Sequence, residues 1–146
     1  MQWVSPYLNF KGDAEEAFAF YKSVFGTEFD GILRFREFGG SAMGVAEADL
    51  DKIAHISLPL TGEISLMASD VVGQDAEAFV AGNNVNIYLE ADSAEEADRL
   101  FEGLSEGGQQ EMPLMQTEWA EKYGMCVDRF GIHWMISFTG EVSFSF

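Results

Sequence analysis

The chain has 146 residues, 47% of them hydrophobic, which is enough apolar material for one domain or for two half-domains with their own cores. Eight basic and 25 acidic residues give a formal net charge of −17, a field that repels nucleic-acid phosphates and anionic lipid. The single cysteine, Cys126, excludes an intrachain disulfide, and neither a basic leader nor a run of about eighteen apolar residues occurs. We therefore expect a cytoplasmic protein without nucleic-acid or membrane partners.

A short pattern occurs twice, as YLNFKGDAEEAFAFY in residues 7–21 and as YLEADSAEEADRLF in residues 88–101. Each copy runs from an extended apolar segment through a polar turn into a helix that opens on Asp13 or Ser93. A glutamate follows three residues later in each, which gives both helices the capping-box pattern. We therefore predict two modules of one design. They span residues 1–69 and 85–138, with a loop at 70–84 and a tail at 139–146.

Alternating and helical hydrophobic periods predict the same order, β-α-β-β-β, in both modules. The first module has expected strands at 3–10, 29–38, 53–60 and 63–69, and a helix at 13–25. The second has expected strands at 85–90, 109–115, 123–130 and 132–138, and a helix from 93 to about 106. Pro113 indicates an edge position for its strand, and the alternating tail suits an added edge strand or a contact with a partner subunit. The fold class is therefore α+β, with paired modules whose mixed sheet curves around a pocket.

A helix must cover one face of each sheet, so the side chains that alternate onto the other face line whatever the two modules enclose. These side chains include hydroxyls, amides, aromatic rings and both histidines, a more polar mixture than a core, and this composition is typical of a pocket. The first module contributes Ser5, Tyr7, Asn9, His55, Ser57, Ser65 and Met67. The second contributes Asn86, Tyr88, Glu90, His133, Met135 and Ser137.

His55, Glu90 and His133 are the candidate catalytic residues within this lining. If they converge, they form a three-ligand site or an imidazole base oriented by a carboxylate; otherwise the histidines are polar groups that hydrogen-bond within the lining. A carboxylate in a walled pocket resists ionisation, so Glu90 is also a candidate proton shuttle, unless it lies at a solvated strand end. Trp119 and Tyr123 suit either stacking on a planar ligand or a dimer interface.

Other conspicuous residues have structural interpretations. Asp70 and Asp128 flank strand ends and are expected to form turns. Trp134 alternates onto the helix-facing side and is expected in the core. Cys126 has no basic neighbour in sequence except Arg129, so we do not expect a nucleophilic thiol.

Five segments carry a family resemblance: PYLNF at 6–10, AEEAFAFYKSVFG at 14–26, LMASD at 66–70, EEADRLF at 95–101, and WAEKYGMCVDRFGIHWMI at 119–136. They resemble PhnB-like proteins, which are often catalogued as 3-demethylubiquinone methyltransferase-like. The duplicated β-α-β-β-β layout is similar to the vicinal oxygen chelate superfamily of glyoxalase I, bleomycin-resistance proteins and extradiol dioxygenases. This resemblance implies the paired-module fold, a homodimer, and in the superfamily at large a metal ion held from the first and last strands of each module.

On this chain the positions of those metal ligands fall at Ser5, Ser65, Asn86 and Met135. None of them is a His, Asp, Glu or Cys, so we predict no metal ion. The chain also lacks the glycine-rich strand-to-helix turn with which a Rossmann-like methyltransferase binds its cofactor, so we predict no cofactor. The sequence favours a metal-free small-molecule-binding protein, and the alternative is a lyase, isomerase or dioxygenase-type enzyme acting on a small vicinal-oxygen substrate. Whether the protein is an enzyme stays open at this point.

Overall fold

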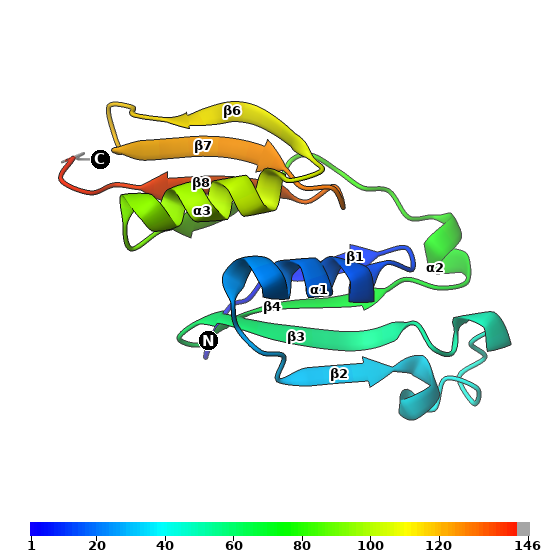
Figure 1. The fold of residues 1–146 in the computed structure, drawn as a ribbon. Helices are drawn as coiled ribbons and strands as arrows, with labels where there is room; N and C mark the ends of the chain where they lie inside the picture. Colours follow the sequence, from blue (N-terminus) through cyan, green and yellow to red (C-terminus); the bar gives the residue numbers. More distant parts are fainter. Residues whose placement is uncertain (143–146) are drawn as a thin grey trace. The chain divides into compact units, whose positions relative to one another are not determined.

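Two units, Met1–Val80 and Ala81–Phe146, make up the chain in the computed structural model, which describes residues 1–142. Each unit contains one four-stranded sheet and one long helix (Figure 1). One of the predicted modules falls in each unit. The predicted edge-strand residues Phe144 and Phe146 lie outside the described residues.

The first unit has the strand order β1-β4-β3-β2, in which β1 runs parallel to β4 and the other neighbours are antiparallel. Its main elements are β1 (Tyr7–Phe10), α1 (Ala14–Phe25), β2 (Gly31–Arg34), β3 (Ile53–Thr61) and β4 (Ile64–Asp70). Three short helices, η1 (Phe35–Phe38), η2 (Glu47–Asp49) and α2 (Gln74–Glu77), lie outside the sheet. The strand expected at 29–38 is therefore too long, because the chain turns into η1 and ends it at Gly39 in the left-handed region, φ 75°.

The second unit repeats this connectivity with the order β5-β8-β7-β6 and a parallel β5–β8 pair. Its elements are β5 (Ile87–Glu90), α3 (Ala94–Ser105), β6 (Gln109–Met115), β7 (Lys122–Val127) and β8 (His133–Phe138). The strand that contains Pro113 is at the edge of the sheet, as predicted. The α+β class and the paired β-α-β-β-β modules are confirmed.

One helix covers one face of each sheet, and the face away from that helix is named the open face. In the first unit Phe18 and Tyr21 of α1 are fully buried against β3 and β4, where Ile56 and Leu66 are fully buried as well. In the second unit α3 packs on β7 and β8, and Trp134 is fully buried, which confirms its expected place in the core. Complete burial of large side chains of this kind stabilises each unit by about 1.5–3 kcal/mol per residue.

The two helices begin in different ways, although their sequences predict the same capping box. Ser93 caps α3 as expected, because its Oγ accepts a hydrogen bond from the Glu96 N–H at 3.0 Å. Asp13 makes no such bond at α1, so that half of the prediction is wrong. Asp70, at the end of β4, replaces it: its Oδ1 accepts the N–H groups of Gly12 and Ala14, both at 3.0 Å.

Asp70 and Asp128 lie at strand ends and accept more hydrogen bonds than those that form a turn. Asp70 is 4% exposed, and its Oδ2 also accepts the Ile53 N–H at 2.9 Å, so one carboxylate connects β4, α1 and β3. Asp128 accepts two backbone N–H groups in the β7–β8 turn, as predicted, and the indole Nε1–H of Trp134 at 2.8 Å as well. Buried donors that lose such an acceptor are costly.

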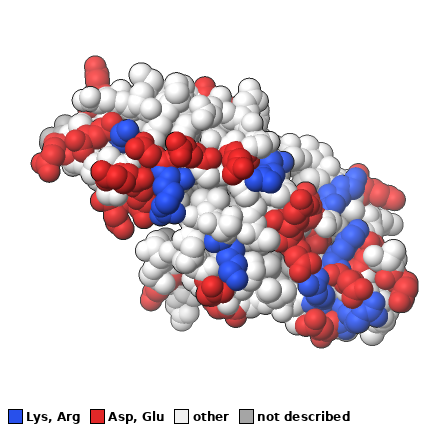
Figure 2. All heavy atoms as spheres, viewed as in Figure 1, with Lys and Arg blue, Asp and Glu red and all other residues white. Residues whose placement is uncertain are grey.

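Basic side chains on the face shown in Figure 2 lie beside acidic ones. Among the ion pairs of the protein, Arg34 and Glu15 lie 2.6 Å apart, and Lys122 and Asp98 lie 3.0 Å apart. Such exposed pairs add little stability. The adjacent carboxylates do lower the positive potential that a phosphate backbone needs.

Replacing Asp70 by Ala leaves three backbone N–H groups without their acceptor, so the free energy of unfolding should fall by about 2–4 kcal/mol. Asp13→Ala is the matched control, because its carboxylate does not cap α1, and it should change stability by less than about 0.5 kcal/mol. Ser93→Ala should cost about 1 kcal/mol. Urea unfolding followed by circular dichroism measures all three. A larger loss for Asp13→Ala than for Asp70→Ala would contradict the role given to Asp70.

Candidate functional site

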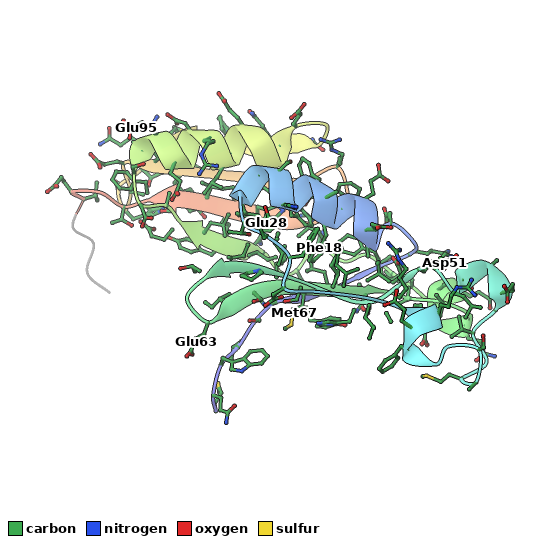
Figure 3. The ribbon with its side chains drawn as sticks, turned by 60° about the horizontal axis from the view of Figure 1, so that its bottom comes forward. Phe18, Glu28, Asp51, Glu63, Met67 and Glu95 are labelled. Carbon is green, nitrogen blue, oxygen red and sulfur yellow. The ribbon has the colours of Figure 1, made fainter. Side chains whose placement is uncertain are left out.

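A tyrosine lies beside a methionine on the open face of both sheets. Tyr7 of β1 pairs with Met67 of β4, and Tyr88 of β5 pairs with Met135 of β8. Figure 3 shows Met67 on the opposite side of the sheet from Phe18 and α1. Tyr7 is 47% exposed and Tyr88 is 53% exposed, so the internal repeat gives each unit an accessible aromatic ring next to a thioether.

In the second unit, the residues that lie opposite one another across the strands from Tyr88 form a row, and the next three members of this row are methionines. Met135, Met125 and Met112 occupy β8, β7 and β6 as direct cross-strand partners, and all three are partly exposed. In the first unit the matching row continues from Met67 to Ser57, which is 7% exposed. Thioether side chains are flexible and polarizable, so the face of the second unit can adapt to an apolar or planar molecule.

Glu90 belongs to the neighbouring row of the same face, across from Ser137. Its Oε1 accepts hydrogen bonds from the Tyr88 hydroxyl at 2.9 Å and the Thr139 hydroxyl at 3.1 Å, and its Oε2 accepts the Thr139 N–H at 2.8 Å. Burial raises the pKa of Glu90, but the hydrogen bonds from Thr139 and Tyr88 lower it further, so the pKa lies below its usual value. The expectation that Glu90 resists ionisation is wrong. Glu90 is therefore a carboxylate at neutral pH.

Aromatic rings and hydroxyls surround this carboxylate. Burial, together with the neighbouring Glu90 and Tyr123, raises the pKa of Tyr88, so Tyr88 stays a phenol. Tyr123 lies across from Ser137 on β7, and its ring meets the Trp119 ring edge to face with centroids 5.3 Å apart. Trp119 is 41% exposed, whereas Ser137 is fully buried, so Ser137 supports the cluster from beneath and does not face solvent.

Two of the candidate catalytic residues, Glu90 and His133, belong to the second unit and lie apart on its sheet, whereas His55 belongs to the first unit. His55 contacts Tyr7, with 3.3 Å between Nδ1 and the hydroxyl oxygen, in the first unit. His133 faces Glu111, with 3.6 Å between Nδ1 and Oε1. Glu90 pairs with Ser137, four residues along β8 from His133, which is about 13 Å along a strand. Within residues 1–142 no three His, Cys, Asp or Glu side chains are gathered so that they could hold a metal ion.

The positions that hold a metal in the superfamily are occupied here by groups that do not suit one. The Ser5 hydroxyl already accepts the Ser65 N–H at 3.1 Å, across the β1–β4 pair. The Asn86 Oδ1 is buried and has no hydrogen-bond partner among the described residues. Met135 offers only a thioether. A hydroxyl, an amide and a thioether are weak ligands for a divalent transition ion, so this donor set does not fit a tightly held metal.

Two contacts of the candidate residues escaped the sequence pattern. Glu111, the partner of His133, lies between Gln110 and Met112, where the β6–β7 register shifts, so simple alternation misplaces it. Thr139 follows β8 directly and donates twice to Glu90, a contact between residues 49 positions apart. The remaining residue of the predicted lining, Asn9, is exposed and accepts a long 3.5 Å hydrogen bond from Ser69.

Two mixed sheets with a helix on each define an α+β protein of the glyoxalase/bleomycin resistance/dioxygenase fold. A solved structure from Burkholderia phytofirmans, described as an enzyme of that family, covers 91% of this chain and 96% of its own with a TM-score of 0.61. At 16% identity this likeness shows the fold alone. Among residues 1–142 no helix combines the length and apolarity needed to cross a membrane.

Sequence comparison identifies the branch. A family model described as 3-demethylubiquinone-9 3-methyltransferase matches residues 2–137, and the chain belongs to this family. It is 30% identical over 141 residues to protein YjdN of Escherichia coli K12, with 92% of this chain and 93% of YjdN covered. A crystal structure from Pseudomonas aeruginosa is 38% identical with a TM-score of 0.79, covering 94% and 97% of the two chains. A Bacillus cereus structure described as a putative 3-demethylubiquinone-9 3-methyltransferase, PhnB protein, is 28% identical with a TM-score of 0.74, covering 94% and 99%.

The thiol of Cys126 should be inert in the folded protein. Cys126 is fully buried, and burial, with smaller contributions from Asp128 and Glu111, raises its pKa to about 12. At pH 8 the thiolate fraction is then only about one in ten thousand. A chromogenic disulfide reagent should therefore react orders of magnitude more slowly with native protein than with protein in urea. Rapid reaction of one thiol per native chain would contradict this burial.

Proposed function

We propose that this protein binds a small molecule without a metal ion, on the open sheet faces that carry the Tyr–Met pairs. The observation that carries the proposal is the second unit, where Tyr88, three methionines and the Trp119–Tyr123 pair share one accessible region. Exposed apolar and aromatic side chains in one place favour association with another molecule. The unsuitable groups at the four superfamily metal positions support a metal-free mode of binding.

Methyl transfer, which the family description names, has less support from this chain. Rossmann-like methyl transfer uses a doubly wound parallel sheet and the free N-terminus of a helix. Here each sheet has one parallel pair, and the N–H groups at the starts of α1 and α3 are bonded to Asp70 and Ser93. The alternative from the sequence is a lyase, isomerase or dioxygenase activity. It has less support than metal-free binding, because the side chains at the expected metal positions, Ser5, Ser65, Asn86 and Met135, are weak metal ligands.

Metal content tests the proposal directly. Protein purified without chelator or affinity tag, soaked in zinc, nickel, manganese or iron(II) and then desalted, should retain well below one ion per chain by mass spectrometry. The matched control is the double variant Asn86→His/Met135→Glu, which supplies an imidazole from the residue before β5 and a carboxylate from β8, the parallel neighbour of β5, and should gain retained nickel. About one tightly held ion per unmodified chain would overturn the metal-free proposal and direct work towards enzyme assays.

We also propose that the chain forms a homodimer in the cytoplasm. Exposed apolar side chains gather where Ser5 bonds to Ser65: Trp3 is 55% exposed, Val4 67% and Ile64 43%. Apolar surface grouped in this way favours a protein contact. This patch belongs to the first unit, whereas the Glu90 row belongs to the second.

Light scattering coupled to size exclusion should give twice the chain mass of 16.2 kDa. The variant Ile64→Ser should shift the protein towards the single-chain mass, because it places a hydroxyl in the apolar patch. Lys11→Ser, an exposed change on the same unit away from the patch, is the control and should remain dimeric. A single-chain mass for the unmodified protein would refute the dimer.

A further inference from the structure

We propose that the open face of the second unit binds an organic cation that has no N–H donors, such as a quaternary ammonium or a delocalised aromatic cation, at Glu90. This inference rests on the proposed small-molecule binding and names the chemistry of the ligand. Its site consists of Glu90, Tyr88, Tyr123 and Trp119.

The first step is an exposed negative charge without a basic partner. Glu90 is ionised at neutral pH, since its hydrogen bonds lower its pKa more than burial raises it. None of the ion pairs within residues 1–142 involves Glu90, whereas Glu15, Asp51 and Asp98 are each paired with a basic side chain. A cation that reaches Glu90 therefore meets an uncompensated carboxylate, and the net charge of −17 attracts cations towards the protein in general.

The second step is the set of aromatic side chains around this carboxylate. Tyr88 donates its hydroxyl to Glu90 and is 53% exposed, and Tyr123 lies next along the row through Ser137. Trp119 packs edge to face on Tyr123 and is itself 41% exposed. The faces of such rings attract cations, and aromatic side chains near a carboxylate are a recognised means of binding quaternary ammonium groups.

The third step decides between cation types. A carboxylate has about four lone-pair positions, and Glu90 already accepts three hydrogen bonds, one from Tyr88 and two from Thr139. A primary ammonium or a guanidinium would have to displace these donors in order to hydrogen-bond. A quaternary or delocalised cation needs only the electric field and the aromatic faces. The occupied oxygens therefore favour a cation without N–H groups.

Three probes of similar size test this order of affinity by calorimetry and by quenching of tryptophan fluorescence. Benzyltrimethylammonium should bind at least about tenfold more tightly than benzylamine, which is a primary ammonium, and than the neutral benzyl alcohol. Because Glu90 has a lowered pKa, its affinity for the cation should be level between pH 6 and pH 8 and should fall only in acid, as Glu90 takes up a proton. Equal binding of benzylamine, or the same affinity after Glu90 is protonated, would overturn the inference.

Variants locate the binding. Glu90→Gln should weaken binding of benzyltrimethylammonium at least about tenfold, while Glu102→Gln, the same charge change on the exposed side of α3, should leave it unchanged. Because Glu90 also anchors Thr139, Trp119→Leu provides a test that leaves that hydrogen-bond network in place, and it should weaken binding about fivefold. An equal loss in Glu102→Gln and Glu90→Gln, or no loss in Trp119→Leu, would place the cation elsewhere and overturn the inference.

The same titrations separate this inference from the proposed function. If neutral or anionic aromatic compounds bind while benzyltrimethylammonium does not, the cation inference fails and small-molecule binding stands. If a broad panel that includes all three probes produces neither heat nor a shift in melting temperature, both fail. Selective binding of the quaternary probe that depends on Glu90 supports both.

Discussion

A buried carboxylate at the end of each sheet sets the geometry on which both open faces depend. Asp70 joins the end of β4 to the start of α1 and to β3, and Asp128 joins the β7–β8 turn to the indole of Trp134. Each one satisfies backbone or indole N–H groups that would otherwise be buried without an acceptor. The strand registers between these anchors place Tyr7 beside Met67 and Tyr88 beside Met135.

Two opposing effects act on Glu90, and their balance determines the chemistry of the second unit. Partial burial favours the neutral acid, whereas the donors of Thr139 and Tyr88 favour the carboxylate, and the hydrogen bonds prevail. The side chain that the sequence suggested as a proton carrier is thereby held as a fixed anion. A fixed anion next to exposed aromatic rings is suited to binding a cation and poorly suited to carrying protons at neutral pH.

The internal repeat provides one framework for two different surfaces. In the first unit the tyrosine meets a histidine, as Tyr7 meets His55, and in the second it meets a carboxylate, as Tyr88 meets Glu90. The rows beside them differ as well, since the row from Met67 leads to a serine in the first unit and the row from Met135 leads to further methionines in the second. The adaptable, anionic surface is therefore a property of the second unit.

The sequence by itself determined the order of the elements, the core position of Trp134, the cap at Ser93 and the side chains that share each open face. It could do so because the period of hydrophobic residues and the spacing of a capping box report local backbone geometry. Only the tertiary structure decided that Asp70 caps the start of α1 and that Thr139 stabilises the ionised form of Glu90. These contacts join groups 56 to 58 and 49 residues apart, and separations of that size leave no periodic trace in a sequence.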